Sequence, residues 1–368
     1  MNKKIILLIL ALSAFALSGC DGQQKQPVLD AGIYKSIDKG EKWNHNVGVA
    51  SFPKTGSLAN TSVLEMYFDP NDQKTIYLTT EGNGIYYSYN SGESWTQSVG
   101  LSKGVIQALA IDPKSKCIIY AANTDNLTIL KTTDCGRSWE NIFWSKEKEN
   151  QTITALAIQP DNSAIIYAGT SLGYIYKSAD QGVSWNPLNT KPLGSKIINI
   201  MIDKNDTNVI YLPTEKKGIF KTLDGGLTGW DKPLVFNCES ATDTNCKNNL
   251  LPNSNFTYRD LIFNPNKPNS LIYASDYGII KTENGGQTWS TLTLLNPAGK
   301  VNIKAIVVNP TDDNELYYIT NTTFYKSKDN GKNWSTKKSP TTKPPSSLWL
   351  NPTDSKIIYF TVTVPPQK

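Results

Sequence analysis

Two carboxylates hold matching places in a repeated segment of this chain, and they are the side chains best suited to acid and base chemistry. Glu65 and Asp260 each stand five residues before the proline that ends an apolar run. Three other copies of the segment have alanine there, namely Ala108, Ala155 and Ala305. Glycoside hydrolysis needs two carboxylates roughly 5 to 9.5 Å apart. Structural carboxylates are common, so the sequence favours strand-end capping or ion pairs with Arg259 and Lys304.

Other kinds of catalytic centre lack a required part. The chain has a single histidine, His45, and no Gly-x-Ser-x-Gly segment. A Ser-His-Asp hydrolase is therefore not indicated. One histidine also leaves few ligands for a transition-metal centre. We expect neither a metal nor a cofactor.

The elements that must position these side chains repeat along the chain. The motif Ser/Thr-x-Asp/Asn-x-Gly-x-x-Trp, called the box below, occurs seven times, and one copy (Thr222 to Trp230) carries an extra residue. Its acidic or amide residue suits a tight turn, its glycine supplies backbone freedom, and its tryptophan anchors the turn. We predict a structural role for the acidic or amide residues of the boxes, which are Asp38, Asn90, Asp134, Asp180, Asp224, Asn284 and Asp329.

A second repeated segment alternates with the boxes along the sequence. An apolar run ending in Asp/Asn-Pro or a variant precedes an Ile-Tyr or Leu-Tyr strand, again seven times. Box glycines recur every 44 to 60 residues, which is the length of a four-stranded blade. The chain opens with a box and closes with an Asn-Pro unit, so residues 346–363 are predicted to pair with residues 31–47. The prediction is an all-β fold, a single seven-bladed β-propeller of four-stranded blades, closed by pairing of its N- and C-terminal strands.

The first residues have the pattern of an export signal. Lys3 and Lys4 precede a short apolar segment that ends in small residues and Cys20. The segment is too short for an ordinary membrane-spanning helix. Its end resembles the lipobox of bacterial lipoproteins, which implies cleavage before Cys20 and attachment of lipid to its thiol.

The predicted organisation follows from this pattern and the repeats. It comprises a lipoprotein signal peptide at residues 1–19, the lipidated cysteine and a tether at 20–30, the propeller at 31–363 and a tail at 364–368. We expect a protein of the bacterial cell envelope that is anchored by lipid on the periplasmic or cell-surface side. Asp21 directly follows Cys20 and resembles a residue that retains lipoproteins in the inner membrane.

Four further cysteines agree with export. An even number in an exported chain suggests disulfides. Cys117 opens one strand and Cys135 lies in the box that ends the next, so a hairpin turning near Asp125 would place them opposite one another. Cys238 and Cys246 bracket a short polar segment. We predict that Cys117 pairs with Cys135 and that Cys238 pairs with Cys246.

The charge balance argues against a nucleic-acid partner. The formal net charge is +5, and two of the positive residues, Lys3 and Lys4, belong to the predicted signal. Lysine dominates, and the only arginines are Arg137 and Arg259. A nucleic-acid footprint needs basic residues clustered on one face, so we expect no nucleic acid among the partners.

The boxes resemble the Asp-box, or BNR, repeats of the propeller superfamily that includes sialidases, sortilin-type receptors and a photosystem II assembly factor. The resemblance covers nearly all the chain after residue 30. It implies that the boxes lie on one face and that ligands meet the opposite face. The binding-face residues that it implies are Glu65, Gln107, Thr154, Asn199, Tyr258, Arg259, Asp260 and Lys304 near the channel, with Glu81, Asp125, Glu215, Lys216 and Asp276 in the turns.

The enzymes of this superfamily need parts that the chain lacks. Sialidases hold a substrate carboxylate with three arginines, and Arg137 belongs to a box on the other face. Xyloglucanases place paired aspartates between two tandem propellers, and here one ring is expected. We therefore predict a non-enzymatic, membrane-anchored binding or assembly scaffold that recognises a protein partner or an envelope complex. The alternative is a glycan-acting hydrolase that uses Glu65 and Asp260.

Overall fold

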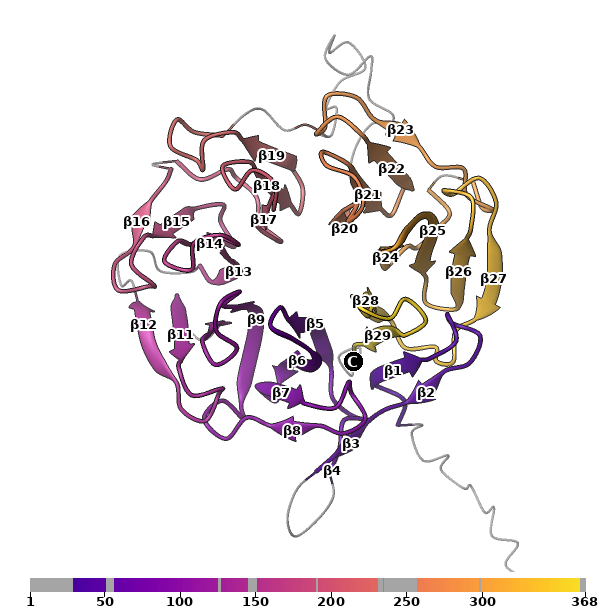
Figure 1. Ribbon diagram of the computed structural model, residues 1–368, viewed down its shortest axis with the longest axis horizontal. Coiled ribbons are helices and arrows are strands. Elements are labelled where there is room, and N and C mark those ends of the chain that lie inside the picture. Colours follow the sequence, from indigo (N-terminus) through magenta and orange to yellow (C-terminus); the bar gives the residue numbers. More distant parts are fainter. Residues whose placement is uncertain are drawn as a thin grey trace, which may run out of the picture.

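The computed structural model describes residues 29–50, 56–124, 127–144, 151–189, 191–230, 234, 257–297 and 299–364. Throughout these residues the regular structure consists of β-strands. The sheets follow one another around a common centre, with one strand of each sheet innermost (Figure 1). Among the residues described, no helix is long and apolar enough to cross a membrane.

Most sheets are antiparallel meanders of neighbouring strands. One sheet has the order β13 (Ile153–Ile158), β14 (Ile166–Thr170), β15 (Ile175–Ser178) and β16 (Asn186–Pro187). The next has β17 (Met201–Ile202), β18 (Ile210–Thr214) and β19 (Gly218–Thr222). Two more follow, made of β20 (Tyr258–Phe263), β21 (Leu271–Ser275), β22 (Ile279–Thr282) and β23 (Ser290–Thr291), then β24 (Ala305–Asn309), β25 (Asp312–Ile319), β26 (Thr323–Ser327) and β27 (Ser335–Lys338).

Two further meanders join into one eight-stranded sheet. They consist of β5 (Val63–Asp69), β6 (Asp72–Gly82), β7 (Ile85–Ser88) and β8 (Thr96–Gln97), and of β9 (Gly104–Ile111), β10 (Ile119–Asn123), β11 (Thr128–Thr132) and β12 (Glu140–Trp144). The join is a short pairing of Glu81 with Val105 and Gly82 with Gly104. The prediction of uniform four-stranded blades is therefore too simple: β6 runs on beyond its hairpin, and the β17–β19 sheet has three strands within the described residues.

The ends of the chain share a sheet. Its order is β2 (Asn44–His45), β1 (Gly32–Ser36), β29 (Ile358–Val362) and β28 (Pro345–Leu350). β1 pairs antiparallel with β29, with Tyr34 opposite Phe360. A small ribbon of β3 (Gly48–Val49) and β4 (Gly56–Ser57) leads from this sheet to β5. Strands from opposite ends of the sequence therefore form one structural unit.

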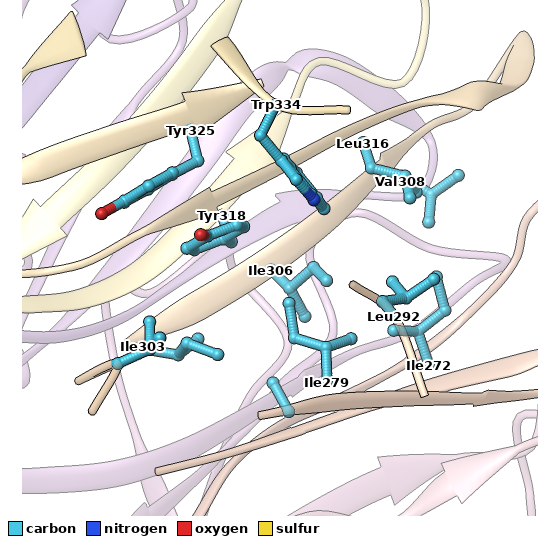
Figure 2. Close-up of a cluster of buried hydrophobic side chains, with 12 residues drawn as sticks. Ile272, Ile279, Leu292, Ile303, Ile306, Val308, Leu316, Tyr318, Tyr325 and Trp334 are labelled. Atoms are coloured by element: carbon cyan, nitrogen blue, oxygen red, sulfur yellow. The ribbon is translucent and has the colours of Figure 1, made fainter. Parts of the chain in front are cut away.

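Buried side chains fill the space between neighbouring sheets. Figure 2 shows one such cluster, in which Ile272 and Ile279 of one sheet face Ile306 and Tyr318 of the next. Comparable clusters lie between the other neighbours. Burying a large apolar side chain contributes about 1.5–3 kcal/mol. This packing holds the sheets face to face and leaves their innermost strands around the centre.

Each box forms the same hydrogen-bonded turn. The Ser or Thr hydroxyl donates to the Asp or Asn side chain over 2.7–2.9 Å. It also accepts the backbone N–H of the box glycine over 2.8–3.1 Å. Hydrogen bonds from the Ser184 hydroxyl and N–H, together with that from Ser178, lower the pKa of Asp180 to about 2. The Asp and Asn side chains of the boxes are thus engaged within their own turns.

The box turns also connect neighbouring sheets. The residue before each box glycine has a left-handed backbone, for example Ser91 with φ 58°. Its carbonyl accepts hydrogen bonds from Tyr359 Oη and Lys35 Nζ, both 2.9 Å away on the preceding sheet. Lys35 also lies 5.7 Å from the ring centroid of Tyr359. The carbonyls of Gln181 and Gly285 each accept hydrogen bonds from a tyrosine and a lysine in the same way. This contact is therefore repeated between sheets.

We expect Ser178→Ala to destabilise the fold by about 1–3 kcal/mol, because it leaves a buried N–H and a carboxylate without their shared partner. Ser178 is fully buried and bonds both Asp180 and Gly182. The measurement is urea unfolding. Ser178→Thr is the matched control, since threonine fills this place in three other boxes. Equal midpoints for Ser178→Ala and the wild type would contradict a structural role of the box.

One of the two predicted disulfides is confirmed. Cys117 and Cys135 are bonded, and Cys135 N–H also donates to the Cys117 carbonyl over 3.2 Å. The pairing of β10 with β11 sets this register. Cys238, Cys246 and Cys20 lie outside the described residues, so the second disulfide and the lipidation remain predictions.

Candidate active site

The innermost strands line a central cavity of about 670 Å³. Residues of β5, β9, β13, β20, β24 and β28 form its wall, together with Lys196, Ile198 and Asn199, which precede β17. In Figure 1 these strands surround the centre of the molecule. Because these innermost segments come from sheets spread along the chain, the cavity brings together side chains that are far apart in the sequence.

A β-bulge recurs at the start of these strands. In each of five strands one residue is skipped in the pairing with the next strand, and that residue lines the cavity. The skipped residues are Leu64, Gln107, Thr154, Arg259 and Ser346. A bulge twists its strand and redirects the local side chains. Glu65 and Asp260 directly follow the bulges of β5 and β20, which explains their shared position in the repeat.

Glu65 is half-buried in the cavity wall and accepts hydrogen bonds from two strands. Its Oε1 lies 3.0 Å from Trp349 Nε1 on β28 and 3.0 Å from its neighbour Met66 N. Burial raises the pKa of Glu65, and bonds from Met66, Trp349 and Ser347 oppose that rise. These donors favour the charged form of the carboxylate.

Asp260 has fewer donors than Glu65, and its pKa is also raised. Its Oδ2 accepts the N–H of Ile306 on β24 over 3.1 Å. Burial raises the pKa of Asp260 to about 7, and the charge of Glu65 adds to the rise. A carboxyl group with such a pKa keeps a large share of its proton near neutral pH.

The predicted ion pairs of these carboxylates are wrong. None of the ion pairs formed by the described residues includes Glu65 or Asp260. Arg259 is the bulged residue of β20, so it leaves the pairing that places Asp260 opposite Ala274. Lys304 precedes β24, whereas the contact of Asp260 with that segment is to Ile306 N. Both carboxylates are held by neutral donors instead.

The structure brings most other predicted binding-face residues to the same wall. Gln107, Thr154, Asn199, Tyr258, Arg259 and Glu215 all line the cavity. Thr154 is turned inward, and its hydroxyl donates to the Ile197 carbonyl over 2.6 Å. Lys304 lies beside the wall, half-buried.

The predicted turn residues are engaged in local bonds. Glu81 accepts from Ser62 Oγ over 3.0 Å, and Asp276 accepts from Thr257 N over 2.9 Å. The N–H of Lys216 donates to Ser195 Oγ over 3.0 Å. Asp125 lies outside the described residues. Glu81 and Asp276 thus make loop contacts through their side chains, and Lys216 makes one through its backbone.

Two aromatic residues of the cavity were missed by sequence reasoning. Trp349 bonds Glu65 directly, and Tyr67 lies two residues after Glu65 in β5. Seven of the nine tryptophans belong to boxes, and Trp349 and Trp144 do not. A tryptophan outside the box pattern was therefore an available signal for Trp349. Tyr67 had none, because tyrosines occur in nearly every strand.

Other sites are less suited to chemistry. A second cavity of about 410 Å³ lies between the turns after β17 and β20. Its polar side chains are used inside those turns: Asp203 accepts from Asn205 N and Asn264 from Asn266 N. Within the described part of the chain, no group of three potential metal ligands occurs.

Comparison with known proteins gives two kinds of likeness. No protein-family model matches the chain. A xyloglucanase from Paenibacillus sp is 26% identical over 204 residues, covering 44% of this chain and 20% of the enzyme. The chain thus spans about a fifth of the length of that curated relative.

Solved structures share the fold. A GH74 enzyme from Niastella koreensis superposes with TM-score 0.63 at 16% identity, over 83% of this chain and 51% of the enzyme. YCF48 bound to D1 peptide superposes with TM-score 0.59 at 16% identity, over 83% of this chain and 94% of that protein. At such identities the likeness concerns the fold alone. The fold is a β-propeller.

The predicted non-enzymatic scaffold function is wrong. The sequence relative is a xyloglucanase, and this favours the hydrolase alternative. The scaffold prediction interpreted Glu65 and Asp260 as structural residues that cap strand ends or form ion pairs with Arg259 and Lys304. Among the described residues neither carboxylate forms an ion pair, both line one cavity, and burial raises the pKa of each.

Proposed function

We propose that this chain is a glycan-acting hydrolase in which Asp260 is the general acid and Glu65 the anionic carboxylate. The observation that carries the proposal is the pair itself. Both side chains line one cavity, and Asp260 has a pKa of about 7 because of burial and the nearby Glu65. A carboxylic acid that keeps its proton near neutral pH can protonate a leaving-group oxygen. The xyloglucanase relative supports the choice of a glycosidic bond.

The reaction assigns one task to each carboxylate. Asp260 gives its proton to the glycosidic oxygen as the bond from that oxygen to the anomeric carbon breaks. Glu65 stabilises the positive charge that develops on the sugar ring, and it either activates water or attacks the anomeric carbon. The separation of the carboxylates in the substrate complex selects between these routes, roughly 5–5.5 Å for attack and 6.5–9.5 Å for water activation. Water ends on the anomeric carbon by either route.

The other residues of the cavity wall have side chains that can bind a sugar. Tyr67, Tyr258 and Trp349 supply aromatic surface, and Gln107 and Asn199 supply amide groups. Binding sites for small molecules combine apolar surface with a few placed polar groups. The alanines Ala108 and Ala155, at the places that match Glu65 and Asp260, also line the cavity.

The direct test is incubation of the full chain with a panel of soluble glycans, beginning with xyloglucan because of the relative. We expect new reducing ends, detected by chromatography of the products. A panel of neutral and acidic glycans that yields no reducing ends from the folded protein would overturn the proposal. Catalytically inactive variants are considered in the Discussion.

We expect a bell-shaped dependence of hydrolysis on pH. Activity should fall as pH rises through about 7, because Asp260 then loses the proton that it must donate. It should fall again at low pH, where Glu65 becomes protonated, and this limb should lie above the ordinary carboxyl pKa of 4.5 because burial raises the pKa of Glu65. The two limbs report apparent pKa values of the coupled pair. Initial rates across the pH range measure both limbs, and a rate that increases steadily above neutral pH would contradict Asp260 as the acid.

We further propose that the propeller is a closed ring of seven Asp-box blades. The pairing of β1 with β29 and the buried clusters on both sides of that sheet support closure. The common box turn supports the Asp-box assignment. In a closed ring the cavity has a complete wall and no sheet edge is left open at the junction.

The N-terminal prediction is also retained as a proposal. The charged start, the apolar segment and Cys20 support an exported lipoprotein of the bacterial cell envelope,. A lipid on Cys20 would keep the hydrolase at the membrane, where it meets glycans outside the cytoplasm. The inner membrane is favoured if Asp21 acts as a retention signal.

A further inference from the structure

Two cations stand beside the proposed catalytic pair, and neither forms an ion pair with any residue that the structure describes. Arg259 lines the central cavity, directly before Asp260. Lys304 precedes β24 and is half-buried. The bond from Ile306 N to Asp260 Oδ2 shows that the start of β24 lies against β20. Arg259 and Lys304 therefore occupy neighbouring segments at the same end of the cavity wall.

The position of Arg259 depends on the bulge. Tyr258 pairs with Ser275 and Asp260 with Ala274, so Arg259 has no opposite residue in the sheet. A bulge of this kind redirects the side chain of the skipped residue. The same place holds leucine, glutamine, threonine or serine in the other bulged strands (Leu64, Gln107, Thr154 and Ser346). Arg259 is thus the only charged residue among the five bulged positions.

Neither cation is compensated within the described part of the chain. The ion pairs there involve other lysines. The Nε atom of Arg259 is buried and has no hydrogen-bond partner. The pKa of Lys304 is lowered by burial and then by the charge of Arg259. Two like charges in a partly buried wall are costly, and an anion bound between them offsets this cost.

We propose that the substrate is an acidic glycan and that Arg259 and Lys304 hold the carboxylate of a uronic acid unit next to the cleaved bond. This inference rests on the proposed hydrolase function and names its substrate class. The planar guanidinium of Arg259 matches a carboxylate with two parallel hydrogen bonds. Lys304 adds a second positive charge close to Arg259. The unpaired Nε atom of Arg259 supplies a donor for this contact.

The positions of the two cations determine where the acidic sugar unit lies relative to the proton donor, Asp260. Arg259 and Asp260 are consecutive, and their side chains leave the strand at its bulge. An anion held by Arg259 therefore lies within one sugar unit of the proton donor. Neutral glycans have no group that offsets the two charges, so they should bind more weakly at this end of the cavity.

The test measures binding and hydrolysis separately. Uronic acid oligosaccharides are each compared with their carboxyl-reduced forms, which keep the same linkages and lose only the charge. Binding is measured by calorimetry on the Glu65→Gln variant of the full chain, so that the ligand is not consumed. We expect the acidic form to bind about 10- to 100-fold more tightly than the reduced form, as a charge-assisted pair implies. We also expect added salt to weaken only the acidic form.

Variants of the two cations, made in the Glu65→Gln background, locate the effect. Arg259→Gln should remove most of the preference for the acidic form, and Lys304→Gln should remove part of it. Arg259→Lys should give an intermediate affinity, because the positive charge stays but the two parallel N–H donors of the guanidinium are lost. Lys328→Gln is the matched control, since Lys328 is an exposed lysine on a box turn. Thermal unfolding of each variant checks folding, and the Arg259→Lys and Lys304→Gln variants keep the test valid if Arg259→Gln unfolds.

The results separate this inference from the proposed function. Four outcomes would overturn the acidic-glycan inference. They are equal affinity for the acidic and reduced forms, unchanged affinity in Arg259→Gln, binding of sulfated oligosaccharides alone, and binding of no oligosaccharide. Hydrolysis of neutral glycans alone would overturn it while leaving the hydrolase proposal intact. Arg259-dependent binding of uronates without hydrolysis would support it while overturning the hydrolase proposal.

Discussion

Replacing either cavity carboxylate by its amide is expected to reduce glycan hydrolysis about 10²- to 10⁴-fold, the usual contribution of a positioned acid or base. Asp260→Asn keeps an oxygen that can accept the N–H of Ile306 but has no proton to give. Glu65→Gln keeps an acceptor for Trp349 Nε1 but loses the negative charge. Initial rates at the pH optimum measure both losses. Glu283→Gln, on an exposed box turn with a 3.5 Å pair to Lys267, is the matched control.

Stability distinguishes a catalytic role of Asp260 from a structural one. Its folded pKa is raised, so the stability linked to its proton is fully present below the ordinary value of 3.8 and is lost as pH rises through about 7,. Asp260→Asn removes a negative charge that destabilises the folded protein above that pH. The variant should therefore unfold at a higher temperature than the wild type above pH 7 and show a smaller difference below it. Full hydrolytic activity in both amide variants would refute the assigned roles.

Removing residues 346–368 is expected to abolish cooperative folding of the whole domain. The deletion takes away most of β28 and all of β29, which pairs with β1 on one side and β28 on the other. Four of the lost apolar side chains are fully buried, namely Ile358, Tyr359, Phe360 and Val362. At about 1.5–3 kcal/mol each, they amount to roughly 6–12 kcal/mol, which is comparable to the total stability of a typical domain.

The contacts of these side chains reach both neighbouring sheets. Phe360 belongs to the cluster with Phe324, and Tyr359 to the cluster with Met66. The deletion therefore also exposes sheet faces on each side and leaves β1 as an open edge. Thermal unfolding followed by circular dichroism is the measurement, and a chain ending at Val364 is the control. A truncated protein with the cooperative transition of the control would show that the ends do not close the structure.

Local features were readable from the sequence because local chemistry decides them. The box turn is built from side-chain bonds between residues two to four positions apart, such as Ser178 with Asp180 and Gly182. The repeated Ile-Tyr pair marks a strand, as at Ile166 and Tyr167 in β14. The Cys117–Cys135 disulfide follows from one hairpin register. In each case the interacting residues lie within one turn or one hairpin, so a repeat in the sequence repeats the structure.

The sequence also marked Glu65 and Asp260 as exceptions within the repeat, but it could not decide their role. Their roles depend on partners from other sheets: Trp349 for Glu65, and Ile306 for Asp260. Those partners are 284 and 46 residues away, and no local pattern relates them. The incorrect ion-pair prediction arose because Arg259 is adjacent in sequence, whereas the bulge takes it out of the sheet pairing.

Tertiary structure alone therefore decided the chemistry of the cavity. Electrostatic interactions depend on distance and on burial, and both are set by how the sheets pack around the centre. Hydrogen bonds on an exposed box turn lower the pKa of Asp180 to about 2, whereas burial in the cavity raises the pKa of Asp260 to about 7. The sequence by itself determined which residues are repeated and which two carboxylates break the repeat. The packing of the sheets determined that those two share one cavity and that burial raises the pKa of each.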